Sequence, residues 1–179
     1  MKHIPLMLMI CLVLFGCSDS SMDNDAANTP DQIQKEGDQI IASKQTGEFE
    51  IRLIIEKSNN DTFTFQPGLK YIGKELENEI LHSKKILDVD LQIEGESILP
   101  PRTTTAEGLT TKLVKDQWYS ENYEITLNSN QLKQISSSNV NVVLNAVFES
   151  AQSSFDDEKR MIISAEEVLW QGQLINTNY

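Results

Sequence analysis

The stretch Val140-Asn-Val-Val-Leu-Asn-Ala-Val-Phe148 decides the fold, because it is the longest run of the chain in which apolar residues recur at every second position. Asn141, Asn145 and Glu149 fall on the opposite face. Successive side chains of a β-strand point to opposite faces of the sheet, so this pattern is typical of a half-buried strand. The stretch therefore predicts a long strand with one face in an apolar core.

Shorter runs of the same kind recur along the chain at spacings near ten residues, separated by turn-forming residues. Many short strands with turn chemistry between them indicate an antiparallel sandwich or barrel. We predict a mostly β domain of about eight or nine short strands, an antiparallel β-sandwich with an immunoglobulin-like arrangement. The other expected strands cover residues 49–56, 62–66, 69–72, 75–82, 86–94, 109–115, 123–127 and 161–170.

Turn and cap residues set the expected boundaries of these strands. Ser58-Asn-Asn-Asp61 and Pro67-Gly68 are turn signals, and Gly95-Glu96 is another. Residues 130–135 have helical spacing, with Asn130 as the expected cap of a short helix that crosses between the sheets. Ile98-Leu-Pro-Pro101 suits a strand edge or a crossing, since proline lacks the amide hydrogen that a central strand needs.

The N-terminus carries a different signal, an apolar run over residues 4–15 behind Lys2 that ends in Leu14-Phe15-Gly16-Cys17. A charged start, a short apolar core and a small residue before the cut describe a secretory signal peptide. With Cys17 directly after Gly16, the stretch resembles the lipobox of bacterial lipoproteins. That resemblance implies cleavage between Gly16 and Cys17 and attachment of acyl chains to Cys17.

Two other interpretations of this stretch remain open: a cleaved signal with a chance cysteine, and an uncleaved anchor. The run is shorter than the roughly 18–20 apolar residues of a membrane-spanning helix. Cys11 lies within the apolar core and is the poorer attachment site. Two or more acyl chains anchor a protein stably, whereas one chain holds it only marginally. We therefore expect a protein bound to the cell membrane by its N-terminal lipid and facing outside the cytoplasm.

These signals divide the chain into four parts. We expect a signal peptide over 1–16, an acylated cysteine and flexible acidic tether over 17–47, a β-sandwich domain over 48–172 and a frayed tail over 173–179. The tether is polar and acidic, which favours a solvated segment, although residues 31–43 could form a helix after Pro30.

The charge of the chain excludes one class of partner. The net charge is -12, and removal of residues 1–16 takes away Lys2 as the sole charged residue, which leaves -13. Binding to a phosphate backbone requires clustered lysine and arginine, so we expect no nucleic-acid partner. The same charge disfavours binding to an anionic membrane through basic side chains.

The residues that carry catalytic or metal chemistry are sparse. His82 is the one histidine left after removal of the signal, and it lies beside Ser83 in no recognisable nucleophile motif. Zinc sites draw on several histidines or cysteines, and calcium sites on six to eight oxygens. Asp88 with Asp90, and residues 156–158, are acidic but lack the spacing of a calcium loop. We expect no enzymatic activity, no metal and no cofactor.

Trp118 and Tyr119 are the candidate ligand-binding residues. Two adjacent aromatic side chains in a loop could stack on a sugar ring or dock a partner, although aromatic residues also cap sandwich cores. The sequence thus predicts a lipid-anchored binding module that presents a β-sandwich to a protein or cell-envelope partner. The alternative is a lipoprotein that binds a small ligand or carbohydrate through these aromatics.

Overall fold

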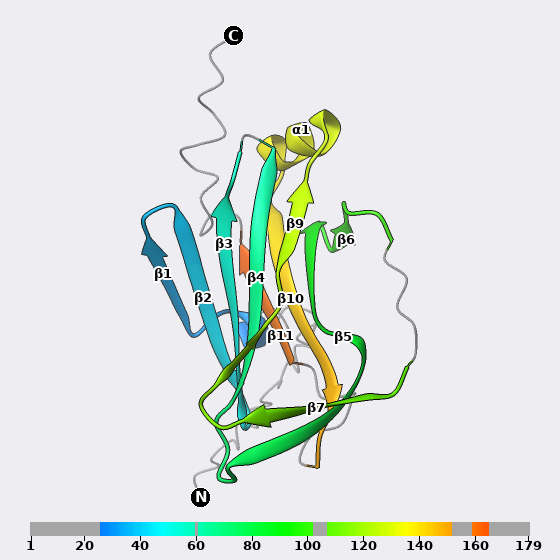
Figure 1. Cartoon of the computed structure of the whole chain (residues 1–179). Helices are drawn as coiled ribbons and strands as arrows, with labels where there is room; N and C mark the ends of the chain where they lie inside the picture. Colours follow the sequence, from blue (N-terminus) through cyan, green and yellow to red (C-terminus); the bar gives the residue numbers. More distant parts are fainter. Residues whose placement is uncertain (1–25, 60, 102–106, 152–158, 165–179) are drawn as a thin grey trace, which may run out of the picture.

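A computed structural model describes residues 26–59, 61–101, 107–151 and 159–164. In these residues the chain is mostly β, with two antiparallel sheets that face each other (Figure 1). Helix α1 (Ser129–Ser137) lies at one end of the two sheets. Within the described ranges, neither α1 nor the 3-10 helix η1 (Ala26–Asn28) has the length and hydrophobicity of a membrane-crossing helix.

The described part of the chain contains eleven strands. Sheet A has the order β1-β2-β3-β4, with β8 and β9 both paired to β4. Sheet B has the order β11-β10-β5, with β6 and β7 both paired to β5. The bounds are β1 (Gln32–Glu36), β2 (Gln39–Thr46), β3 (Phe49–Lys57), β4 (Thr62–Tyr71), β5 (Glu77–Ile93), β6 (Glu96–Ser97), β7 (Leu109–Val114), β8 (Trp118–Ser120), β9 (Tyr123–Thr126), β10 (Val140–Glu149) and β11 (Lys159–Ser164).

The predicted strand over 140–148 is confirmed as β10, which lies between β5 and β11. Its inward side chains join those of β3 and β4 in one core. Phe148 meets Phe49 of sheet A edge to face, with ring centroids 4.8 Å apart. The two sheets are therefore joined through apolar side chains, and the predicted mostly β, antiparallel sandwich-like fold is confirmed. The immunoglobulin-like arrangement stays a prediction.

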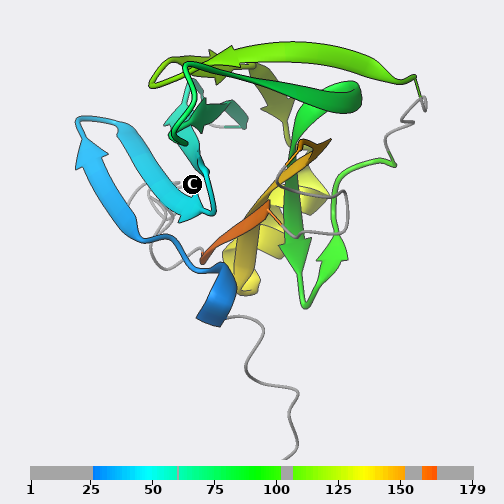
Figure 2. The same cartoon turned by 90° about the horizontal axis from the view of Figure 1, so that it is seen from below.

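The expected tether is wrong over residues 31–47, and so is the helix expected over 31–43. Strands β1 and β2 form a hairpin there, closed by Gly37 and Asp38, and β2 pairs with β3 through a second hairpin at Gly47. Both glycines have φ near +60°, which a hairpin turn of this kind requires and which glycine adopts without steric cost. The polar residues of β1 are exposed because it is an edge strand (Figure 2), where polar composition is no sign of a tether.

The turn expected at Pro67-Gly68 is also wrong, because both residues lie inside β4. Pro67 pairs with Leu53 of β3 on one side, and its carbonyl accepts a hydrogen bond from the Glu121 amide on the other. Since the amide and carbonyl of one strand residue point to the same side, the missing amide hydrogen of Pro67 faces the break between β8 and β9. A central strand thus tolerates a proline at this position.

The two strands expected over 75–82 and 86–94 form a single strand, β5, of 17 residues. Residues 78, 80 and 82 are buried in its first half, whereas 87, 89 and 91 are buried in its second. The alternation changes phase in between, near the irregular pairing between Ala146 and Phe148 of β10. Figure 1 shows that β5 curves strongly there, so that its first half and β7 cross the lower end of the molecule.

The predicted helix is present but begins earlier than expected. Its cap is Asn128, not Asn130: the Asn128 side chain accepts hydrogen bonds from the amides of Asn130 and Gln131, and the Gln131 side chain accepts one from the Asn128 amide. This reciprocal pair is a capping box. Residues 1–25, 165–170 of the last expected strand and the expected tail 173–179 lie outside the described residues.

Candidate functional site

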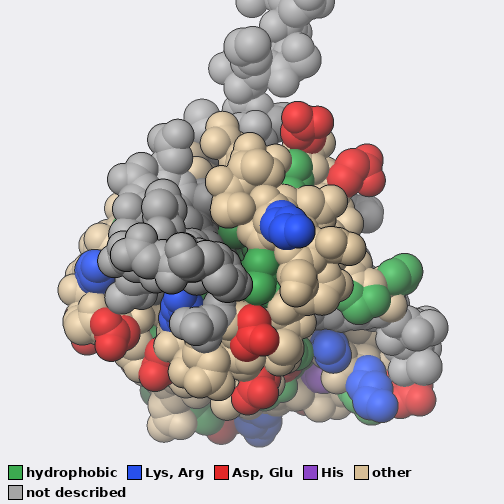
Figure 3. All heavy atoms as spheres, turned by 90° about the horizontal axis from the view of Figure 1, so that it is seen from above, with side chains coloured by type: hydrophobic (Ala, Val, Ile, Leu, Met, Phe, Trp, Pro, Cys, Tyr) green, Lys and Arg blue, Asp and Glu red, His purple; other side chains and the backbone are tan. Residues whose placement is uncertain are grey.

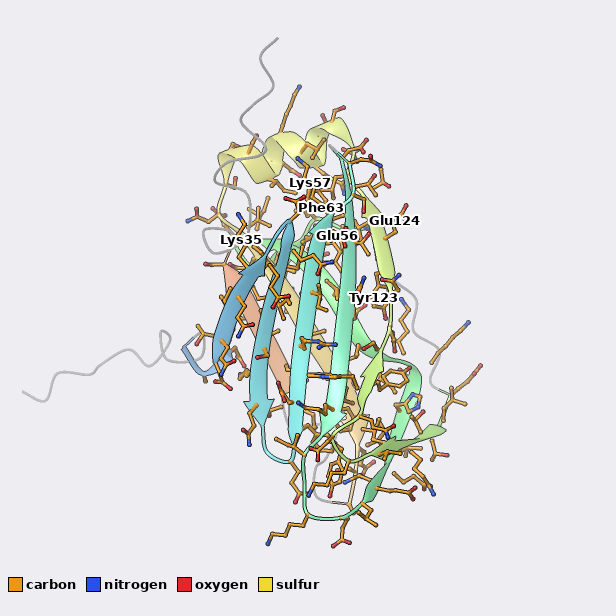
Figure 4. The ribbon with its side chains drawn as sticks, turned by 60° about the vertical axis from the view of Figure 1, so that its left-hand side comes forward. Lys35, Glu56, Lys57, Phe63, Tyr123 and Glu124 are labelled. Carbon is orange, nitrogen blue, oxygen red and sulfur yellow. The ribbon has the colours of Figure 1, made fainter. Side chains whose placement is uncertain are left out.

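The candidate residue Trp118 lies on the outer face of sheet A. Figure 4 looks onto this sheet, with Lys35 of β1 at one edge and Tyr123 and Glu124 of β9 toward the other. The Trp118 indole lies over Gly68, where a Cβ atom would come within 3.0 Å of its Cε3. The guanidinium of Arg52 lies 4.0 Å from the ring centroid.

Charged side chains surround the indole and pair with one another. The Lys70 ammonium lies 4.6 Å from the Trp118 centroid and also forms an ion pair with Glu50. Burial lowers the pKa of Arg52, and the charge of Glu50 acts in the opposite direction. We call the set of Arg52, Lys70, Glu50 and Trp118 the sheet A cluster. Its cations are engaged by an aromatic ring and a carboxylate, so its contacts are largely internal to the sheet.

Tyr119 points to the opposite face from Trp118, because the two are consecutive residues of strand β8. It pairs with the buried Leu69 and packs against the core. Its hydroxyl donates to Glu121 at 3.1 Å. Burial, the charge of Glu121 and this hydrogen bond raise the pKa of Tyr119 to about 12. The structure therefore does not bring Trp118 and Tyr119 together as one stacking platform.

Glu121, between β8 and β9 of sheet A, links the two sheets. Its carboxylate accepts hydrogen bonds from the hydroxyls of Tyr119 and Tyr123, and from the amide of Ile86 in β5 at 3.4 Å. The Tyr123 hydroxyl also contacts the Leu87 carbonyl at 2.6 Å. These contacts join the β8–β9 segment of sheet A to β5 of sheet B. Tyr119 and Tyr123 therefore have a structural role in holding the two sheets together.

His82 is buried on the inner side of the first half of β5. Its Nδ1 lies 2.5 Å from the Ser83 carbonyl and therefore donates to it, and its Nε2 lies 2.8 Å from the Thr111 hydroxyl of β7. The spacing of Thr111 and His82 matches a nucleophile and its base. However, neither residue lines the two surface pockets described below, and the contacts satisfy the hydrogen-bonding groups of a buried imidazole.

Of the acidic residues singled out in the sequence, Asp90 is held by neighbouring polar groups, and residues 156–158 lie outside the described residues. Asp90 accepts hydrogen bonds from the Leu91 amide, the Gln92 side chain and, at 2.6 Å, the Ser97 hydroxyl. Asp88 precedes it on the same strand face. In the part of the chain that the structure describes, no three or more His, Cys, Asp and Glu side chains are placed to hold a metal ion.

Two shallow surface pockets are lined entirely by described residues. One, of about 610 Å³, lies beside the start of α1 and is lined by Leu99, Ile125 and Gln131 among others. The Gln131 side chain donates to the Ile98 carbonyl at 2.7 Å and so fixes this wall. Figure 3 views the molecule from the α1 end and shows that acidic and basic side chains both lie on that face. The second pocket, of about 550 Å³, lies on the outer side of β5 and β7.

The second pocket is the feature that the sequence analysis missed. Its signal was present in the alternation of Glu77, Glu79 and Leu81, which all point outward from β5. The pattern predicted a strand, but it gave no reason to place Glu149 of β10 and Thr110 of β7 beside Leu81, as the pairing register does. The lipidation and cleavage residues Cys17 and Gly16 lie outside the described residues.

Comparison with known proteins assigns no family to the chain. No family model and no curated protein matches it. A solved structure described as a protein from Archaeoglobus fulgidus is similar, with 7% sequence identity and a TM-score of 0.37 over 68% of this chain and 93% of that one. A similarity of this size carries no argument about function.

Proposed function

We propose that the protein is a lipid-anchored binding module, without enzymatic activity, that presents its β-sandwich to a protein or cell-envelope partner outside the cytoplasm. The observation that carries the proposal is the stretch Leu14-Phe15-Gly16-Cys17 after an apolar run and before a polar, acidic one. Acyl chains on Cys17 anchor the protein to the membrane surface without a spanning segment.

The corrected N-terminal boundary changes how far such an anchor lets the domain reach. The described chain is held to the domain from Ala26 onward, because the Lys44 ammonium contacts the Ala27 carbonyl and the Asn28 side chain. Eight residues, 18–25, separate Cys17 from Ala26. A span of nine residue steps covers at most about 30 Å. We therefore propose a domain held close to the membrane surface rather than on a long tether.

A small-ligand or carbohydrate binder that uses Trp118 is the alternative. Its support is an indole on the outer face of a sheet, packed over Gly68, where a sugar ring could stack. Against it, Arg52 and Lys70 already lie over that indole, and Tyr119 points away from it. A ligand would have to displace these contacts. The arrangement thus favours the binding module over the carbohydrate binder.

Replacement of Cys17 by serine tests the proposal. We expect the full-length Cys17→Ser variant to lose membrane retention after cell fractionation, and mass spectrometry of the N-terminal peptide to show loss of the acyl chains. The matched control is Cys11→Ser, which changes the other cysteine and leaves Gly16-Cys17 intact. Equal membrane retention of both variants, with a fully cleaved Cys17→Ser chain, would contradict the lipid anchor.

A further inference from the structure

Exposed apolar side chains lie on the part of sheet B where β5 pairs with β7 and with the end of β10. Of the six large hydrophobic residues exposed in the described part of the chain, Ile33 lies apart, on the edge strand β1. Leu76, which is 80% exposed, lies on the loop before β5, and Leu109 of β7, which is 41% exposed, pairs with the buried His82 and so faces the inner side of the strand pair. The remaining three lie on the outer side and are 38% to 46% exposed: Leu81 of β5, Val114 of β7 and Val147 of β10. Single exposed apolar residues are ordinary, whereas a cluster marks an interaction surface.

The pairing register shows how this surface is built. Leu81 lies in the middle strand, between Glu149 of β10 and Thr110 of β7. The next outward position along β5 is Glu79, which faces Lys112 across the pair. The pocket of about 550 Å³ is bordered by Glu79, Leu81, Thr110 and Glu149 of this set. We call this surface, with its pocket, the β5–β7 face.

The β5–β7 face is strongly acidic. Glu75, Glu77, Glu79 and Glu149 all line its pocket. The ion pair that the structure forms here joins Lys112 to Glu77 at 2.9 Å, and this contact raises the pKa of Lys112. No salt bridge within the described ranges involves Glu79 or Glu149. The face thus combines apolar side chains with an excess of negative charge.

The loop that begins this face is held in place from within. The Tyr71 hydroxyl accepts a hydrogen bond from the Glu75 amide at 3.3 Å, and Gly73 packs so closely on the Tyr71 ring that a Cβ atom would overlap it. The Leu76 carbonyl accepts a hydrogen bond from the Lys115 amide. Leu76 is therefore exposed on a fixed backbone, and its exposure is built into the fold.

From this geometry we infer that the β5–β7 face docks a partner protein through a segment that combines lysine or arginine with apolar side chains. Such a segment is complementary in charge to the face, because its basic side chains pair with Glu79 and Glu149 while its apolar ones cover Leu81. A second copy of this chain would bring the same acidic face against itself, and an anionic membrane would be repelled. The inference rests on the proposed binding function and names its partner class.

A peptide of defined sequence tests the inference with the full-length protein in neutral detergent micelles. The probe is a fluorescein-labelled nine-residue peptide of alternating lysine and leucine, and its control has glutamate for each lysine. We expect fluorescence anisotropy to show that the lysine peptide binds the protein and the glutamate peptide does not. The signal from the lysine peptide should exceed its signal with micelles that contain no protein. The double variant Glu79→Gln/Glu149→Gln should weaken its affinity at least tenfold, and Leu81→Ser should do the same.

The matched control variant is Glu36→Gln/Glu96→Gln, which removes two exposed carboxylates elsewhere. Its affinity should stay within twofold of the unchanged protein. Equal weakening by both double variants would show attraction by net charge alone and overturn the inference, as would absence of peptide binding. Binding to anionic vesicles that depends on Leu81 would identify a membrane surface instead. These outcomes do not depend on Cys17, so the proposal of a lipid anchor and the proposal of a docking face can be contradicted separately.

Discussion

The outer face of sheet A and the β5–β7 face both carry charged and apolar side chains, but they satisfy them differently. On sheet A, Glu50 pairs with Lys70, Arg52 lies over Trp118, and Glu56 accepts a hydrogen bond from Gln39. On the β5–β7 face, four glutamates line a pocket, and one of them, Glu77, forms an ion pair with Lys112. The difference teaches that a conspicuous tryptophan can be a structural residue, while the surface suited to a partner carries no aromatic marker.

The core beneath both faces should give the largest effect. Phe148 is fully buried behind the β5–β7 face and contacts Phe49 behind sheet A. We expect Phe148→Ala to lower the free energy of unfolding by about 3–5 kcal/mol, because it removes a large buried side chain and leaves a cavity. Urea unfolding followed by circular dichroism measures the loss. A loss below about 1 kcal/mol would show that the two faces do not share one core.

Substitution of Trp118 and of Leu81 should separate the two faces. We expect Trp118→Ala to cost about 1–2 kcal/mol of stability, through lost packing on Gly68 and lost contact with Arg52, and to leave the affinity for the lysine peptide unchanged. Leu81→Ser should change stability by about 0.5 kcal/mol or less, because Leu81 is exposed, and should weaken peptide binding.

The same urea unfolding and the anisotropy assay measure both variants. The comparison breaks if Trp118→Ala weakens peptide binding as much as Leu81→Ser does, because sheet A would then contribute to the docking surface. A Trp118→Phe variant is the control that keeps an aromatic ring over Gly68.

Tyr119 should make stability depend on alkaline pH. Its pKa is about 12 in the folded protein and near 10 in an unfolded chain. Between those values the folded state binds more protons than the unfolded state, so stability falls as pH rises from 10 to 12. We expect Tyr119→Phe to reduce this fall. Thermal unfolding at pH 9, 10 and 11 measures it, and an unchanged pH dependence in the variant would contradict the raised pKa.

The ion pair of the sheet A cluster should give the smallest effect. Glu50 and Lys70 are partly exposed, and exposed pairs contribute roughly 0–1 kcal/mol. We expect Glu50→Gln to lower stability by that amount at low salt and by less at 0.5 M NaCl, because salt screens the attraction. Thermal unfolding at the two salt concentrations is the measurement. A loss that grows with salt would show that Glu50 acts through something other than charge.

Local patterns predicted most of the fold, and the errors have physical causes. Alternation placed β3, β7, β9 and β10 correctly because each buries one face of its strand. It failed for β1, whose residues are all exposed at a sheet edge. The hairpin signal Gly37-Asp38 was nevertheless present in the sequence. Pro67 of β4 was wrongly predicted to lie in a turn. The strand accommodates it because no partner strand pairs with it between β8 and β9, and that break arises from the packing of distant segments.

The site was less predictable than the fold. Trp118 and Tyr119 stood out as neighbours in sequence, but a three-residue strand sends them to opposite faces. The β5–β7 face depends on pairing between residues far apart in sequence, such as Leu81 with Glu149. The spacing of residues within one segment does not indicate which residues of distant strands pair. The charged and apolar residues of the face could therefore be read from the sequence, but their arrangement could not.

Site-specific photocrosslinking in intact cells tests the docking face most directly. A benzoylphenylalanine at the exposed Thr110, on the β5–β7 face, is compared with one at the exposed Ser120, on sheet A. We expect position 110 to capture one protein, with the crosslink mapped by mass spectrometry to a segment rich in lysine or arginine, and position 120 to capture none. Capture at position 120 alone, or of an acidic segment or a second copy at position 110, would contradict the docking face.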